Sequence, residues 1–233
     1  MPLKIVPVLV SANSEWRAVV SILQPASIQQ SLPGAYFQTE IDGQSCLFFH
    51  SGWGKVNTAA STQYVIDQYH PGLIINIGTC GGFSGFCKVG ETLLVTETLI
   101  YDIVERMDDP SAALAHYTTR NETDWITRPL PEGTRKARIV SADQDIDFRA
   151  FDLLTKTHQA DAADWETGAF AWVAARNQTK WLALRGVSDL VSPQGSETDS
   201  SVYLWRSRLD QLMRKIVADL PFYISEFQCN FFS

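Results

Sequence analysis

Two short, largely apolar runs constrain the fold of this 233-residue chain more than any other feature. The first, Leu73 to Ile77, is followed by the glycine-rich segment 78–85, and the second, residues 181–187, is followed by Ser188 and Asp189. Such runs are typical of buried strands in a parallel sheet. In open α/β folds, ligands bind where such strands end. The sequence therefore predicts an α/β protein with a small-molecule site at these strand ends.

Strand patterns alternate with helix patterns along the whole chain. The predicted strands are 3–10, 36–41, 45–50 (joined to the previous one by the hairpin signal Asp42-Gly43), 73–77, 91–98, 137–140 and the run from Trp181. The predicted helices are one that begins at the N-cap Ser14, then 56–69, 148–157, 165–175 and 201–224. This alternation predicts an α/β fold with a mixed or largely parallel sheet in a single domain. Residues 102–135 are polar and are expected to form a long excursion or lid.

Charge and composition exclude several classes of function. The formal net charge is −7 and no basic run is present, so neither nucleic acid nor an anionic membrane surface is a predicted partner. No stretch approaches the roughly 18 apolar residues of a membrane span. The four cysteines form no C-x-x-C and the four histidines have no ligand spacing, which predicts no metal site and no disulfide scaffold. We therefore expect a soluble, cytoplasmic protein with reduced thiols.

Three carboxylates are candidates for acid/base chemistry, and each has an ordinary structural alternative. Asp189 follows a buried strand, where partial desolvation favours proton donation near neutral pH, but it also suits a helix N-cap or an ion pair with Arg185. Glu166 and Glu15 stand near helix starts, where a carboxylate also complements the helix dipole. The glycines of segment 78–85 either bring backbone amides to a ligand or serve turns and packing. The three acids indicate acid/base chemistry only if they converge on one site.

Four motifs follow one another between Val6 and about Val191. They are Ser51-Gly52-Trp53-Gly54-Lys55-Val56-Asn57, Asn76-Ile77-Gly78-Thr79-Cys80-Gly81-Gly82 with Lys88-Val89-Gly90-Glu91, Asp164-Trp165-Glu166-Thr167, and Arg185-Gly186-Val187-Ser188-Asp189. They resemble the G-x-G-K motif, the core glycine motif, the E-M-E-A segment and the R-x-I-S-D segment of the nucleoside phosphorylase/nucleosidase superfamily. The 5′-methylthioadenosine/S-adenosylhomocysteine nucleosidase branch looks most similar. The resemblance implies one domain over 1–233, a three-layer sandwich around a mixed, largely parallel twisted sheet.

The resemblance also implies a role for each acid. Asp189 would protonate N7 of the leaving purine, Glu166 would hold the ribose hydroxyls, and Glu15 would activate water as the general base. The implied substrate-binding set is completed by Trp165, Cys80, Gly81, Ser188, Asp145 and Ile146. The implied reaction is hydrolysis of a purine nucleoside without cofactor or metal. Family members commonly form homodimers, and the aromatic C-terminus is expected to pack on a partner subunit or on the core; its residues are Phe222, Tyr223, Phe227, Phe231 and Phe232.

Water is predicted as the nucleophile in preference to phosphate. Phosphorylases of this superfamily have G-D-P-x-R after the first strand, where this chain has Ser-Ala-Asn-Ser-Glu over residues 11–15. Uridine-type members have an arginine where this chain has Asn76. A phosphate dianion would lose its bidentate partners here, and Glu15 would repel it. Phosphorolysis is the alternative.

Two departures from the family pattern leave the substrate open. Trp165 replaces the methionine of E-M-E-A, and Asp145 stands where the family has a phenylalanine that stacks on the base. Stacking would then come from Phe83, Phe86, Tyr101 or Trp205. These changes indicate a substrate other than methylthioadenosine, and futalosine-like nucleosides fit as well. A catalytically silent homologue that binds a nucleoside is the alternative from a different functional class.

Overall fold

Strands and helices alternate in the computed structural model, which describes residues 5–197 and 202–231. The strands are β1 (Val6–Val10), β2 (Gln29–Gln30), β3 (Ala35–Ile41), β4 (Gln44–His50), β5 (Leu73–Phe83), β6 (Thr92–Ile100), β7 (Thr118–Arg120), β8 (Thr134–Ser141), β9 (Ala162–Asp164), β10 (Lys180–Ser192) and β11 (Gly195–Ser196). The helices are α1 (Asn13–Leu23), α2 (Gly54–Tyr69), α3 (Pro110–His116), α4 (Thr167–Arg176) and α5 (Val202–Phe231), with a 3₁₀ turn η1 (Phe148–Ala150) and a π turn η2 (Leu153–Thr157). The predicted strand start at Leu3, the predicted helix start at Ser201 and the aromatic Phe232 lie outside the described residues.

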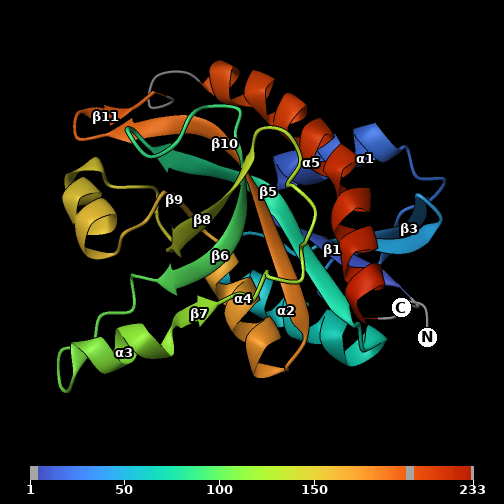
Figure 1. Cartoon of the computed structure of the whole chain (residues 1–233), viewed down its shortest axis with the longest axis horizontal. Coiled ribbons are helices and arrows are strands. Elements are labelled where there is room, and N and C mark those ends of the chain that lie inside the picture. Colours follow the sequence, from blue (N-terminus) through green and yellow to red (C-terminus); the bar gives the residue numbers. More distant parts are fainter. Residues whose placement is uncertain (1–4, 198–201, 232–233) are drawn as a thin grey trace.

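One mixed sheet joins the strands in the order β11-β10-β6-β8-β9-β5-β1-β4-β3-β2, with β7 paired to β6 (Figure 1). The strand β10 also pairs with β5 in parallel, so β5, β10, β6, β8 and β9 form a closed ring. The parallel neighbours β4, β1, β5 and β10 end on the same side. The predicted α/β fold with a mixed sheet is confirmed. The closed ring of five strands is a feature that the sequence did not predict.

Alternate side chains of the central strands face two different helical layers. Val8 and Val10 of β1 belong to the cluster that includes Trp16 of α1 and Met213 of α5. Leu9, between them, belongs to the cluster that includes Phe170 of α4. Figure 1 shows α1 with α5 and α2 with α4 as two separate helical pairs around the sheet. Because both faces are covered, the central strands are apolar at nearly every position.

The strands β5 and β10 are longer than the sequence predicts. The glycine-rich segment is not a loop, since β5 continues through it to Phe83. Similarly, β10 does not stop at Asp189 but continues to Ser192, with a bulge between Val187 and Asp189. The glycines serve close packing: a Cβ on Gly82 would lie 2.7 Å from Cγ1 of Val187. A rule that ends a strand at the first polar or glycine residue therefore fails here.

Three smaller predictions also need correction. Helix α1 begins at Asn13 with Ala12 as its N-cap, so Ser14 lies inside the first turn. Residues 148–157 form the 3₁₀ turn and the π turn in place of a regular α-helix. The polar excursion 102–135 contains α3 and β7; the Asp109 side chain caps α3 by accepting from the Ser111 N–H at 2.9 Å.

The C-terminal helix α5 packs on the core. Tyr223 and Phe227 are fully or almost fully buried in the cluster shared with α1. The Glu226 carboxylate anchors the 102–135 excursion, since it accepts from the Thr127 N–H at 2.6 Å and also binds the Arg128 guanidinium. Of the predicted aromatic C-terminus, Phe231 stays 43% exposed. The core is therefore the partner of most of these rings.

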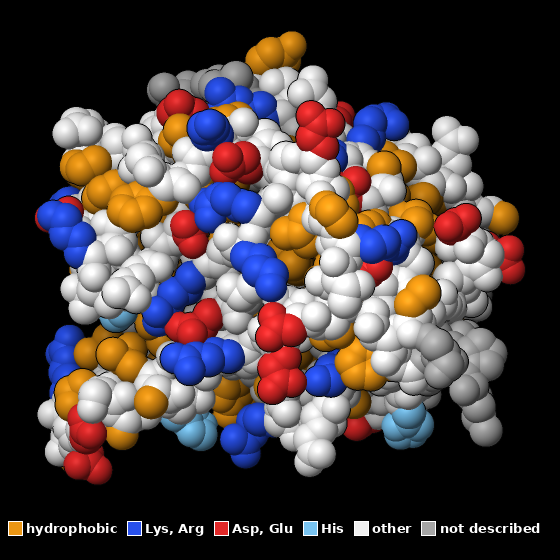
Figure 2. Space-filling model, viewed as in Figure 1, with side chains coloured by type: hydrophobic (Ala, Val, Ile, Leu, Met, Phe, Trp, Pro, Cys, Tyr) orange, Lys and Arg blue, Asp and Glu red, His pale blue; other side chains and the backbone are white. Residues whose placement is uncertain are grey.

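The face shown in Figure 2 mixes acidic, basic and apolar side chains. Exposed ion pairs, such as Lys156 with Asp152 at 2.8 Å, contribute little to stability, typically about 0–1 kcal/mol. Within residues 5–197 and 202–231, no helix is both long enough and apolar enough to cross a bilayer. Stability therefore comes mainly from the two apolar layers.

Gly186 marks a close approach between β10 and α5. A Cβ at Gly186 would lie 2.8 Å from Cδ2 and 2.9 Å from Cβ of Leu212, which is 4% exposed. We predict that Gly186→Ala lowers the free energy of unfolding by about 1–3 kcal/mol, because overpacking forces one element to move. Chemical denaturation measures the change. In a Leu212→Ala background the same substitution should cost less, because Cγ and Cδ2 are gone and only Cβ remains close. An equal cost in both backgrounds would show that the Leu212 side chain beyond Cβ is not the constraint.

Candidate active site

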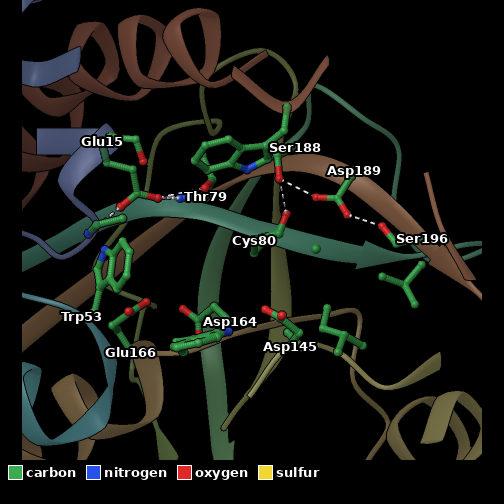
Figure 3. Close-up of a pocket in the computed structure, with 18 residues that line it drawn as sticks. Glu15, Trp53, Thr79, Cys80, Asp145, Asp164, Glu166, Ser188, Asp189 and Ser196 are labelled. Carbon is green, nitrogen blue, oxygen red and sulfur yellow. Dashed lines mark hydrogen bonds between the residues drawn. The ribbon is translucent and has the colours of Figure 1, made fainter. Parts of the chain in front are cut away.

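A cavity of about 640 Å³ lies where the parallel strands β1, β5 and β10 run toward their carboxyl ends. Nine residues that the sequence predicts for the site line this cavity (Figure 3); they are Glu15, Cys80, Gly81, Asp145, Ile146, Trp165, Glu166, Ser188 and Asp189. In Figure 3, Glu15, Trp53 and Glu166 lie at one end, and Asp145, Asp189 and Ser196 lie at the other. The three candidate acids are thus on one cavity, at two separate ends.

Glu15 is held from α1 and β5 together. Its Oε1 accepts from the Thr79 N–H at 2.6 Å and from the Thr79 hydroxyl at 2.8 Å, and its Oε2 accepts from the Ala12 N–H at 3.3 Å. A Cβ on Gly78 would lie 2.9 Å from Oε2, so this approach needs glycine. Burial raises the pKa of the Glu15 carboxyl, while the Arg185 charge and the Thr79 hydrogen bonds oppose that rise. The result is a fixed carboxylate with raised basicity.

Glu166 stands at the N-cap of α4 and connects it to α2. Its Oε1 accepts from the Gly54 N–H at 3.0 Å, at the first residue of α2. Burial raises the pKa of Glu166 to about 8, and the negative charges of Asp164 and Glu15 add to the rise. Glu166 therefore lines the cavity from the N-cap position of α4.

A buried ion pair between Arg185 and Asp164 lies close enough to Glu15 and Glu166 to affect the pKa of both. Arg185, 1% exposed, donates from Nε to Oδ2 of Asp164 at 2.6 Å and from Nη2 to Oδ1 of Asn76. Asp164 also accepts from the Ser141 hydroxyl at 2.5 Å and from the Thr167 N–H at 3.2 Å. The ion pair of Arg185 is thus made with Asp164. Asn76 belongs to this network and also donates to the Leu9 carbonyl at 3.0 Å.

Asp189 lies within β10, opposite Gly81 of β5, and is 8% exposed. Its Oδ1 accepts from the Ser188 hydroxyl at 2.6 Å, and its Oδ2 accepts from the Ser196 hydroxyl at 2.8 Å (Figure 3). Consecutive residues of a regular strand face opposite sides. The bulge between Val187 and Asp189 explains why Ser188 and Asp189 both line the cavity. The helix N-cap alternative for Asp189 is wrong, since the residue is in a strand.

Comparison with known proteins places this site in a family. A sequence profile described as the phosphorylase superfamily matches residues 24–219. The chain belongs to that superfamily. It is 31% identical over 207 residues to the 5′-methylthioadenosine/S-adenosylhomocysteine nucleosidase of Marinomonas sp. (strain MWYL1), which covers 81% of this chain and 89% of the relative. The predicted family is confirmed.

Solved structures share the fold over nearly the whole chain. The 5′-methylthioadenosine/S-adenosylhomocysteine nucleosidase of Neisseria meningitidis, in complex with methylthio-immucillin-A, has a TM-score of 0.75 and 19% identity over 97% of this chain and all of that one. A futalosine hydrolase mutant of Helicobacter pylori has a TM-score of 0.78 and 14% identity over 95% of this chain and 99% of that one. At these identities the likeness establishes the fold.

Several lining residues of this superfamily member were missed as site residues in the sequence. Thr79 and Trp53 lie inside motifs that mark the superfamily, but nothing local singles them out. Ser196 follows the turn signal Pro193-Gln194-Gly195, which predicts a chain reversal after β10. Among the four aromatic residues considered for base stacking, Trp205 lines the described cavity, whereas Phe83 is buried against Phe151 with ring centroids 5.6 Å apart.

The cavity wall is strongly acidic. Five carboxylates line it, and among the described lining residues there is no lysine or arginine; the five are Glu15, Asp145, Asp164, Glu166 and Asp189. A concave surface of one sign repels ligands of that sign. No group of three or more His, Cys, Asp or Glu side chains within residues 5–197 and 202–231 is arranged to hold a metal ion. The described wall therefore offers many acceptors to hydroxyl or amino donors of a ligand and no cationic side chain to an anion.

Glu166 predicts a pH dependence of stability. Its pKa lies above the ordinary value of 4.5, at about 8, so the folded protein holds this proton more tightly than the unfolded chain does. The stability that it contributes is full below pH 4.5 and is lost as pH rises toward 8. We predict that Glu166→Gln, whose amide oxygen still accepts from Gly54, flattens this fall in the free energy of unfolding. Denaturation at several pH values from 4 to 8 measures it.

The control is Glu132→Gln, because Glu132 is exposed. This variant should keep the pH dependence of the wild type. Parallel curves for Glu166→Gln and the wild type over the whole range would contradict the raised pKa of Glu166.

Proposed function

We propose that the protein hydrolyses the N-glycosidic bond of a purine nucleoside, releasing the free base and a ribose derivative. The observation that supports this best is the placement of Asp189 at one end of an acidic cavity and of Glu15 with Glu166 at the other. An acid and a base on either side of an electrophilic carbon are what glycosidic hydrolysis requires. Membership in the phosphorylase superfamily supports cleavage of an N-glycosidic bond, by water or by phosphate.

In the proposed mechanism each acid acts at a different atom. Asp189 gives a proton to N7, so the purine leaves as a neutral heterocycle. Glu15, fixed by Thr79, takes a proton from the attacking water, and its raised pKa makes it a better base near neutral pH. Glu166 accepts hydrogen bonds from ribose hydroxyls and, when ionised, stabilises positive charge on the sugar. Arg185 is buried and does not line the cavity, whereas its partner Asp164 does; we assign neither a direct part in the reaction.

The acidic wall favours water over phosphate as the nucleophile. A phosphate dianion needs cationic or bidentate donors, and the described lining residues offer five carboxylates. Asn76, at the position where uridine-type phosphorylases have arginine, is committed to Arg185 and to the Leu9 carbonyl. Glu15 and Ser14, in place of the phosphate-binding segment, both line the cavity. These features support hydrolysis.

The proposed substrates are 5′-substituted purine nucleosides. Relatives of this chain are nucleosidases for 5′-methylthioadenosine and S-adenosylhomocysteine, and a futalosine hydrolase shares its fold. Three tryptophans line the cavity, namely Trp53, Trp165 and Trp205, and offer flat apolar surfaces for a base or a 5′ group. We also propose a cytoplasmic location and a homodimer, in which a second subunit would cover Trp53, 57% exposed at the cavity; sedimentation of the purified chain tests the dimer.

Release of free purine in the absence of phosphate tests the proposed function. We expect the protein to release base from at least one of methylthioadenosine, S-adenosylhomocysteine, adenosine and futalosine in phosphate-free buffer, followed by chromatography. Added phosphate should not raise the rate or produce a ribose 1-phosphate. Release that requires phosphate would establish phosphorolysis, and no release with any purine nucleoside would favour a silent nucleoside-binding homologue.

Asp189→Asn separates catalysis from binding. The amide keeps the size of the side chain but has no acidic proton, so kcat should fall by about 10²–10⁴-fold. Glu15→Gln should lower kcat for the complementary reason, loss of the base. Calorimetric titration with the nucleoside should give dissociation constants for both variants close to the wild-type KM. Asp152→Asn, an exposed site in a surface ion pair, is the control; equal kcat for Asp189→Asn and this control would rule Asp189 out as the acid.

A further inference from the structure

A short hairpin brings Ser196 back to Asp189. In the β10–β11 pair, Val191 is opposite Ser196 and Ser192 is opposite Gly195, whose φ of 133° favours glycine. Asp189 and Val191 are two residues apart on one strand and share a face, so the side chain of Ser196 is on that face too. The Ser196 hydroxyl donates to Oδ2 of Asp189 at 2.8 Å, and both residues line the cavity.

The hairpin is fixed from α5 and from its own backbone. The Glu197 N–H donates to the Leu190 carbonyl at 3.1 Å, just beyond the paired residues. Arg208 of α5 donates from Nη1 to the Ser188 carbonyl at 2.8 Å and to Oε2 of Glu197 at 3.0 Å. The Arg208 guanidinium thus contacts both arms of the hairpin. The position of the Ser196 hydroxyl is therefore set by contacts outside the cavity.

The two oxygens of Asp189 have different surroundings. The Ser188 hydroxyl lies 2.6 Å from Oδ1 and 3.2 Å from the Cys80 carbonyl oxygen, and with one proton it donates to only one of them at a time. Ser196 supplies a hydroxyl donor to Oδ2. A donor to a carboxyl oxygen favours the ionised form, and hydrogen bonds to charged groups are the stronger ones. The Ser196 hydroxyl is thus positioned to stabilise the Asp189 carboxylate once the proton has left.

We propose that Ser196 is a positioning residue for this proton transfer: it fixes the plane of the Asp189 carboxyl and stabilises the carboxylate that forms. The inference rests on the proposed function. In that step the O–H bond of Asp189 breaks and an N7–H bond forms, while the C1′–N9 pair of electrons passes to the purine. Water bonds to C1′ and its proton goes to Glu15. Proton exchange with solvent then restores both carboxyl groups.

Ser196→Ala tests the proposal by steady-state kinetics. We expect kcat for base release to fall about tenfold, in line with one hydrogen bond to a charged group, with KM changed by less than about twofold. Ser196→Thr keeps a hydroxyl and should restore kcat.

The matched control is Ser192→Ala in the same hairpin. The Ser192 hydroxyl accepts from the Gln194 N–H at 3.2 Å and donates to the Gly195 carbonyl at 3.1 Å, so its loss affects the turn. This variant should keep the wild-type kcat and KM. Equal losses of kcat in Ser192→Ala and Ser196→Ala, or no recovery of kcat in Ser196→Thr, would assign the effect to hairpin stability and overturn the proposal. Unchanged kinetics in Ser196→Ala would overturn it as well, with the proposed hydrolysis intact.

Base release by the wild type distinguishes the two proposals. Unchanged kcat in Ser196→Ala, with base release by the wild type, would reject the role of Ser196 alone. Absence of purine release by the wild type would reject the proposed reaction and this role of Ser196 together.

Discussion

The site depends above all on the parallel pairing of β5 with β10. Their register puts Arg185 opposite Gly78 and Asp189 opposite Gly81. Both glycines leave space that a side chain would fill: a Cβ on Gly78 would lie 2.9 Å from Oε2 of Glu15, and one on Gly81 would lie 2.6 Å from Cδ1 of Ile146. The same pairing that closes the ring thus makes room for the acid from α1 and for the lining residue Ile146. A loop at these positions would not hold either of them to a fixed distance.

The buried positive charge of Arg185 offsets part of the cost of burying several carboxyl groups at the cavity. Burying a charge without a partner costs several kcal/mol, roughly 3–5 kcal/mol when one partner of a pair is removed. Here Asp164 and Asn76 satisfy the guanidinium, and its charge also lowers the pKa of Glu15 against the effect of burial. Burial still raises the pKa of Glu166, and repulsion by Asp164 and Glu15 adds to that rise. The folded state gives up some stability to keep these acids together, as functional sites commonly do.

Sequence reasoning recovers what local patterns encode. The apolar runs predict the central strands, and the family resemblance predicts nine residues that share one cavity, six of them within the four motifs. Properties that depend on contacts distant in sequence are missed: Arg185 meets Asp164 across 21 residues, and β5 stays a strand because β9 and β10 pair with its glycines. Ser196 is missed although it is only seven residues from Asp189, because the hairpin geometry, and not the spacing, brings them together. Ser14 is not the cap, since Ala12 is the N-cap and Glu15 at the third helical position accepts from the Ala12 N–H.

The residues proposed for the chemistry and the other residues at the cavity come from different kinds of element. Asp189 lies in a ring strand, and Thr79 of β5 holds Glu15, so both are tied to the sheet. Asp145 and Trp53, in contrast, come from the segment after β8 and the turn before α2, and both are exposed. Loops change with less structural cost than buried strands do. Under the proposed function, substitutions on these two loops would alter substrate choice at less structural cost than substitutions in the sheet.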